Sequence, residues 1–269
     1  MAFVVPYAVV FVAFVVYPVA WGLWMARAPA LYADLAANPV YARTLVNTAL
    51  YVGLGVNIKM FLALLLSGFF VRRRWWIRAL FAVYLLPWAL PAIPAFVSFH
   101  WMLIGDEGLV NRLLSLLVGV PGPRWLDDRA LALGWNIVAY VWKWLPFWTL
   151  TFVAARTAIP RELHEAAAVD GAGGCRRFLH VVLPLLGSLY LVCTLLSTLW
   201  ALGDFTTVAL VSGGAPAYST DVLATLGFQY AFDAAQPTLG VAAVMSALPV
   251  LIPVALLLMR AVEAREIQL

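Results

Sequence analysis

Six long apolar stretches dominate the chain, and short segments that carry most of the charge separate them. The stretches cover residues 1–26, 44–71, 79–105, 130–155, 181–220 and 234–259. A helix crosses a bilayer with about 20 apolar residues, and these stretches are too long and too uniformly apolar for the alternating strands of a membrane barrel. The pattern therefore predicts six transmembrane helices. Prolines inside the stretches predict kinks that are packed against neighbouring helices.

The composition indicates a protein that is surrounded mostly by lipid. Of 269 residues, 65% are apolar and 11% are charged, whereas a soluble domain has about a quarter charged residues. The 17 Lys and Arg are too sparse and scattered to form a face for nucleic acid. No linker rich in Pro, Gly or Ser divides the chain. Residues 1–269 are therefore predicted to form one all-α transmembrane domain.

The arginines predict the orientation of the spans. Six spans place both termini on one side of the membrane, and if that side is the cytoplasm, the inner segments hold ten arginines and the outer segments five. The inner set is Arg72, Arg73, Arg74, Arg78, Arg156, Arg161, Arg176, Arg177, Arg260 and Arg265, and the outer set is Arg27, Arg43, Arg112, Arg124 and Arg129. Cytoplasmic loops carry an excess of basic residues. Both termini are therefore predicted to be cytoplasmic.

Two short motifs resemble enzyme sites but are incomplete. His164 and Glu165 begin a zinc-protease motif, yet Ala168 stands where that motif needs its second histidine. Gly203 and Asp204 resemble half of an intramembrane aspartyl protease site, and no other predicted span holds an acidic residue. Neither lysine follows a glycine as a P-loop requires. The chain is therefore predicted to be no enzyme and to bind no cofactor or metal.

The predicted cytoplasmic segment 156–180 suggests two short helices. Glu162 suits the first turn of a helix, and three alanines at 166–168 favour its continuation. Gly171 is suited to the end of this helix, and a second helix is expected through residues 176–177. Alanines let another protein approach closely, so the first helix is a candidate docking helix. An ordinary solvated connection explains the same residues equally well.

The same segment resembles a known family motif. The matching residues are Glu165, Ala166, Ala167, Gly171, Val181, Leu183 and Pro184. Their spacing resembles the EAA motif of permease subunits of binding-protein-dependent ABC importers, with Val181 in place of the usual isoleucine. Asp170-Gly171-Ala172 is similar to the carbohydrate-uptake branch. Further similarity, at 47–48, 86–88, 108–111, 142–147, 159–163 and 213–216, most resembles the first of the two permeases in maltose-type and glycerol-phosphate-type systems.

That resemblance implies a fold, a location and a set of partners. The fold would be the six-helix type I ABC importer permease fold in a bacterial or archaeal plasma membrane. A second permease subunit would complete the pathway, two ATP-binding cassette ATPase subunits would bind the EAA loops, and an extracytoplasmic solute-binding protein would deliver a sugar or related polar solute. Glu165 would pair with a basic residue of the ATPase. The implied ATPase-docking residues are Glu162, Glu165, Ala166, Ala167, Asp170 and Gly171.

The outer connections add two expectations. The loop 27–41 is short and holds no inserted domain, and the chain starts almost inside its first span. Contact with a binding protein is therefore expected to rest on smaller loops. Apolar residues together with Asn111 and Arg112 predict a short helix at 109–118 that lies at the membrane interface.

Three charges inside predicted spans are further candidates for function, because burying a charge in a bilayer costs roughly several kcal/mol. Asp204 and Lys59 are candidates to line a polar translocation pathway. Asp204 is equally a candidate for a structural ion pair with a lysine, and Lys143, beside an aromatic cluster, is the favoured partner. The alternative function is a self-sufficient six-helix secondary transporter or channel that uses Asp204, Lys59 and Lys143. It explains the buried charges but not the EAA spacing.

Overall fold

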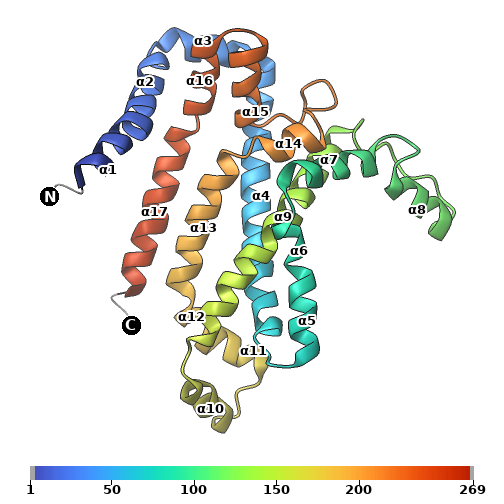
Figure 1. Cartoon of the computed structure of the whole chain (residues 1–269), viewed down its shortest axis with the longest axis vertical. Helices are drawn as coiled ribbons and strands as arrows, with labels where there is room; N and C mark the ends of the chain where they lie inside the picture. Colours follow the sequence, from blue (N-terminus) through green and yellow to red (C-terminus); the bar gives the residue numbers. More distant parts are fainter. Residues whose placement is uncertain (1–3, 267–269) are drawn as a thin grey trace.

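The computed structural model describes residues 4–266, and every regular element in this range is helical (Figure 1). Four segments are long and apolar enough to cross a membrane singly: Val5–Met25, Pro39–Phe70, Arg129–Thr157 and Pro237–Ala264. Two further spans are bent pairs, Trp75–Ala89 with Ala92–Leu103 at 91° and Gly174–Leu185 with Gly187–Leu202 at 68°. With each bent pair counted as one span, the six predicted spans are present.

The elements follow one another in a simple order, with three short π-helical turns among the α-helices. They are α1 (Val4–Phe11), η1 (Val12–Val16), α2 (Tyr17–Met25), α3 (Pro29–Ala37), α4 (Pro39–Phe70), α5 (Trp75–Tyr84), α6 (Leu86–Ala89), α7 (Ala92–Leu103), α8 (Leu109–Val118), α9 (Arg129–Thr157), α10 (Arg161–Val169), α11 (Gly174–Arg177), η2 (Phe178–Val182), α12 (Leu183–Leu185), α13 (Gly187–Leu202), α14 (Thr206–Val211), α15 (Leu223–Phe228), η3 (Gln229–Asp233), α16 (Pro237–Met245) and α17 (Leu248–Glu266).

The two longest helices, α4 and α9, pack against each other at the centre of the molecule. Side-chain caps start both, because Asn38 accepts a hydrogen bond from the Val40 N–H and Asp128 accepts one from the Leu131 N–H. Gly55 of α4 faces the ring of Tyr140, where an added Cβ would lie 3.1 Å from a ring carbon. Small residues allow membrane helices to approach closely. α13 packs against both α4 and α17.

Polar contacts tie the segment 212–222 to the end of α4 that lies near α3 and α15 in Figure 1. The Asn47 amide donates hydrogen bonds to the backbone carbonyls of Ser219 and Asp221, at 2.8 and 2.9 Å. Its carbonyl oxygen accepts one from Arg129, at the start of α9, at 2.9 Å. Asn47 therefore joins α4, α9 and this segment at one point.

The first span stands apart from the central helices (Figure 1). None of its most apolar window is buried, and its side chains are largely exposed. Contact with the rest of the chain is made near its end, where Ala26 and Leu35 pack with Ala242 and Ala243 of α16. The single chain therefore leaves most of this span uncovered.

The predicted stretch 181–220 is not a single span, which corrects the sequence-based expectation. α13 ends at Leu202, and a separate short helix, α14, begins at Thr206. The carboxylate of Asp204 accepts a hydrogen bond from the Thr207 N–H at 3.0 Å, so it caps the start of α14. Asp204 therefore lies at a break between two helices rather than inside a continuous one.

The short helix predicted at 109–118 is present as α8. Leu116 and Leu117 are 80% and 81% exposed, whereas Asn111 is buried on the other side. The Asn111 amide donates to the carbonyls of Gly105 and Pro123, and its oxygen accepts from the Trp125 indole. These bonds hold the connection between α7 and α9 as a compact hairpin with an apolar outer face.

Candidate functional site

The segment 156–180 protrudes from one end of the helix bundle, as α10 shows at the bottom of Figure 1. α10 covers nine residues, and Glu162 and Glu165 on it are exposed. Ala166 is exposed and Ala167 is half-buried. The two carboxylates and the alanines are therefore accessible to another protein.

A sharp turn at Gly171 ends α10. The backbone there is left-handed, with φ +70°. The Ala172 N–H donates to the Ala167 carbonyl at 2.9 Å, and the Gly171 N–H donates to the Ala168 carbonyl at 3.1 Å. This pair of bonds is the Schellman motif, which favours glycine at the left-handed position. The predicted helix, turn and second helix are all present, since α11 follows at once.

A groove lies beside this turn, between α10 and the helix that leads back into the bundle. Its volume is about 580 Å³, and its lining is Ala167, Asp170, Ala172, Arg176, Arg177, His180 and Val181. Asp170 is exposed. The site residues expected from the EAA motif thus lie on one protruding helix and along one open groove.

A second polar site lies where α13 gives way to α14. Asp204 is half-buried there, and three donors hold its carboxylate. One oxygen accepts from the Thr207 N–H at 3.0 Å, and the other accepts from the Thr207 hydroxyl at 2.5 Å and the Tyr51 hydroxyl at 2.7 Å. Charge-assisted hydrogen bonds of this kind are the strong ones. The carboxylate is therefore held in one orientation.

Lys59 lies on the other side of a tyrosine pair. Its ammonium donates to the Tyr140 hydroxyl at 2.7 Å and stands 4.0 Å from the centre of that ring. The rings of Tyr140 and Tyr51 are 5.1 Å apart. Among residues 4–266, no salt bridge involves Lys59 or Asp204. Tyr51 therefore contacts the carboxylate, Tyr140 contacts the ammonium, and the two rings lie next to each other.

The Asp204 carboxylate borders a cavity of about 200 Å³ with aromatic walls. Tyr140, Trp144 and Trp200 form the rest of the lining. Lys59 is almost fully buried and does not line it. The cavity thus combines flat apolar faces, one phenol and one carboxylate. Such a surface is chemically suited to a solute that presents both C–H and O–H groups.

Lys143 does not form the ion pair that was expected with Asp204. Its ammonium donates instead to three backbone carbonyls at the bend between α6 and α7, those of Pro87, Trp88 and Leu90. The bend leaves these carbonyls without helical partners, and a lysine from the neighbouring helix satisfies them. The predicted ion pair between Lys143 and Asp204 is therefore wrong. The expectation that a helix kinked at its prolines packs against a neighbouring helix is confirmed, since α6 and α7 contact α9.

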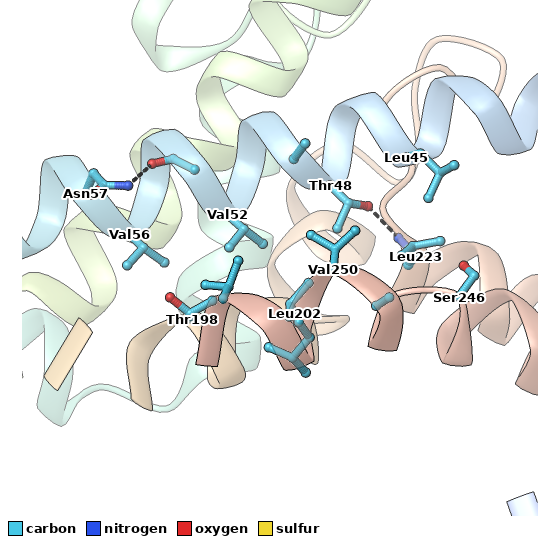
Figure 2. A pocket seen from close by; sticks show the side chains of 15 residues that line it. Leu45, Thr48, Val52, Val56, Asn57, Thr198, Leu202, Leu223, Ser246 and Val250 are labelled. Carbon is cyan, nitrogen blue, oxygen red and sulfur yellow. Dashed lines mark hydrogen bonds between the residues drawn. The ribbon is translucent and has the colours of Figure 1, made fainter. Parts of the chain in front are cut away.

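A third groove, of about 490 Å³, runs between α4, α13 and α17 (Figure 2). Figure 2 shows Val52, Val56, Leu202 and Val250 on its walls. Its polar groups are few, and two are already engaged, since Thr48 accepts from the Leu223 N–H and the Asn57 amide donates to a carbonyl of its own helix. This groove offers little to a polar solute.

Sequence reasoning missed the residues that surround Asp204. Tyr51 precedes Lys59 by eight residues, which places the two on one face of α4, so helical spacing from the buried lysine was a usable signal. Trp144 and Trp200 carried no such signal, because aromatic residues are common throughout these spans.

Comparisons with known proteins agree on the kind of molecule. Residues 59–268 match the family model described as binding-protein-dependent transport system inner membrane component. Three similar curated proteins are the trehalose/maltose transport system permease protein MalF of Thermococcus litoralis (36% identity over 185 residues), the sulfoquinovosyl glycerol transport system permease protein SmoG of Agrobacterium fabrum (34% over 196) and the sn-glycerol-3-phosphate transport system permease protein UgpA of Yersinia pseudotuberculosis (33% over 183).

These alignments cover 69%, 72% and 67% of this chain and 60%, 62% and 60% of the respective relatives. The chain therefore spans about three fifths of their length. A chain of a bacterial alginate ABC transporter, in complex with an alginate pentasaccharide-bound periplasmic protein, has the same fold. Its TM-score is 0.86 at 21% identity, over 96% of this chain and 91% of that one. A second alginate transporter structure gives 0.83 at 22% identity, over 98% and 94%.

Proposed function

Because this chain belongs to the family of binding-protein-dependent transport system inner membrane components, we propose that it is a permease subunit of an ATP-driven ABC importer for sugars. A second permease subunit would complete the pathway, two ABC ATPase subunits would supply the energy, and a solute-binding protein would deliver the sugar. The relatives named for trehalose/maltose and sulfoquinovosyl glycerol support a sugar as solute. Both termini would lie in the cytoplasm.

The observation that carries the coupling role is the protruding helix α10. A helix with exposed carboxylates at Glu162 and Glu165 and a fixed turn at Gly171 fits a groove on another protein. Residues at 162, 165, 166, 167, 170 and 171 would form the contact with an ATPase. Burial of Glu165 against a basic residue would transmit movement of the ATPase to α9 and η2, which flank the segment 156–180.

Asp204 and its aromatic cavity are the proposed part of the translocation pathway in this chain. Lys59, bound to the Tyr140 hydroxyl and outside the lining, would offset the carboxylate charge only in part and would not touch the solute. A carboxylate with no cation lining the same cavity repels anions. We therefore assign a neutral sugar to the cavity, in contrast to the anionic solutes in the names of the sulfoquinovosyl glycerol and glycerol-phosphate relatives.

Replacement of Glu165 tests the coupling role. In membranes that contain the second permease and the ATPase, Glu165→Lys is expected to weaken ATPase pull-down and to abolish uptake, since it sets like charges together in a desolvated contact. Glu263→Lys, an exposed acid on α17, is the matched control and should bind ATPase normally. Normal ATPase binding and uptake by Glu165→Lys would refute the coupling role.

A screen of the cognate binding protein against neutral and anionic sugars identifies the solute for the pathway test. With that sugar, Asp204→Asn is expected to raise the KM for uptake while ATPase association stays unchanged. Asp34→Asn, an exposed carboxyl in α3, is the control. Unchanged uptake by Asp204→Asn would remove this cavity from the pathway. Uptake driven by an ion gradient in the purified chain alone would favour the secondary transporter instead.

A further inference from the structure

The third span contains a sharp break with an unusual number of prolines. The segments Trp75–Ala89 and Ala92–Leu103 meet at 91°. In a continuous helix the N–H of residue i donates to the carbonyl of residue i−4, and proline has no N–H. Pro91 therefore removes the donor for the Pro87 carbonyl, and Pro94 removes the donor for the Leu90 carbonyl. Within a membrane such carbonyls need another partner.

Lys143 of α9 provides that partner. Its ammonium donates to the carbonyls of Pro87 at 2.8 Å, Trp88 at 3.2 Å and Leu90. An ammonium has three N–H donors, so all three are used, and each goes to a carbonyl of the broken span. The side chain is 2% exposed and does not line the aromatic cavity. Lys143 therefore has no donor left for a solute.

The bend that Lys143 holds is linked to the cavity wall through the rings of Trp88 and Phe147. The ring of Trp88 lies 5.6 Å from that of Phe147, and the ring of Phe147 lies 5.9 Å from that of Trp200, which lines the cavity. Trp88 is one of the residues whose backbone carbonyl Lys143 binds. The position of the Trp88 ring is therefore tied to this ammonium.

We propose that Lys143 is a positioning residue for the transport pathway: it replaces the backbone donors that Pro91 and Pro94 remove, fixes the bend, and so sets Trp88 against Phe147, the ring that packs on the cavity-lining Trp200. The relevance of this placement to transport rests on the proposed function of the cavity. A lysine in this role needs no counter-ion, because its partners are carbonyl dipoles on three sides.

Thiol labelling tests the placement without any solute. The assembled transporter would carry Cys175→Ser and Cys193→Ser, with Trp88→Cys as the reporter at the bend. Trp76→Cys on α5 of the same span is the matched control, since Trp76 is 41% exposed and Trp88 is 39% exposed. Addition of Lys143→Met is expected to change the labelling rate at position 88 several-fold and to leave position 76 unchanged. Equal rates with and without Lys143 at position 88 would overturn the proposal, and so would equal changes at both positions, which indicate a general structural role.

A second variant covers the case in which Lys143→Met does not accumulate. Pro91→Ala and Pro94→Ala together return two backbone donors to the Pro87 and Leu90 carbonyls. Combined with Lys143→Met, they are expected to restore accumulation in the membrane, while labelling at position 88 stays altered because the bend is lost. Failure of this combination to accumulate would refute the carbonyl-binding role. Neither result depends on uptake by Asp204→Asn, so failure of the pathway assignment is recognised separately.

Discussion

The hydroxyl of Tyr51 lies 2.7 Å from a carboxylate oxygen of Asp204 and donates a hydrogen bond to it, although the two residues are 153 positions apart. This bond joins α4 to the break between α13 and α14. The ring of Tyr51 also lies 5.1 Å from that of Tyr140, against which Lys59 packs. The charges of two helices are thereby linked through aromatic side chains.

Removal of the Tyr51 hydroxyl should leave the Asp204 carboxylate less firmly oriented. Tyr51→Phe keeps the ring but loses a hydrogen bond to a charged group, which contributes roughly 1.5–3 kcal/mol. We expect the Tm of the purified protein to fall and the KM for uptake to rise. Tyr17→Phe, on the exposed first span, is the control and should change neither quantity. An unchanged Tm and KM for Tyr51→Phe would show that Thr207 alone holds Asp204.

The effects on uptake of replacing Lys59 and of replacing Asp204 should depend on each other. Removal of either charge leaves the other uncompensated in an apolar region, so Lys59→Met and Asp204→Asn should each reduce uptake. The double variant should recover part of the loss, with a coupling energy of roughly 0.5–3 kcal/mol in a double-mutant cycle. The cycle is measured from the uptake rates of the unmodified protein, the two single variants and the double variant at matched expression. Strictly additive effects would indicate that the tyrosine pair insulates the two charges.

Gly171 is needed for the turn after α10 because its φ is +70°. Alanine at this left-handed position costs roughly 1–2 kcal/mol, whereas proline requires φ near −65° and removes the N–H that bonds the Ala168 carbonyl. We therefore expect Gly171→Ala to lower uptake moderately. Gly171→Pro should abolish uptake with a smaller loss of ATPase binding, because α10 itself remains. Uptake and pull-down on the same membranes measure both, and full uptake by Gly171→Pro would contradict the role of the turn.

The burial of Asp221 predicts that the stability of the protein depends on pH. Burial raises the pKa of its carboxyl, although hydrogen bonds from Thr225 and Gln229 act in the opposite direction. The folded protein therefore holds this proton more tightly than the unfolded chain. The resulting stabilisation is present below the unfolded pKa and is lost as the pH rises through the raised folded pKa.

Comparison of Tm at about pH 4.5 and about pH 7.5 tests this linkage. Asp221→Asn removes the titrating group, so the gain in Tm on acidification should be smaller than in the unmodified protein. Asp34→Asn, an exposed carboxyl, should leave that gain unchanged. An equal gain in all three proteins would exclude Asp221 as its source.

Cys175 tests the proposed orientation. It is exposed, whereas Cys193 is buried, so an impermeant thiol reagent should report on position 175. We expect no labelling in intact cells and clear labelling in inside-out vesicles. Cys175→Ser should abolish the signal. Labelling of intact cells at Cys175 would place the segment 156–180 outside and would exclude its contact with an ATPase.

The sequence by itself determined that the chain is helical and membrane-spanning, because lipid requires long apolar helices whose backbone bonds are internal. It also predicted the helix, turn and helix of the segment 156–180, since Glu162, the alanines and Gly171 act within their own neighbourhood. The family was likewise recognisable from local spacing around Glu165 and is confirmed by the match over residues 59–268.

Only the tertiary structure decided what the buried charges contact. Asp204, Lys59 and Lys143 were recognised as exceptional because a charge in a bilayer is costly, but their partners on other helices lie 53 to 153 residues away along the chain. Local pattern could not show that Asp204 ends a span, or that Lys143 binds carbonyls rather than a carboxylate. Pro91 and Pro94 mark carbonyls that lack a backbone donor, but the side chain that binds those carbonyls was decided by the packing of α9 against the bend.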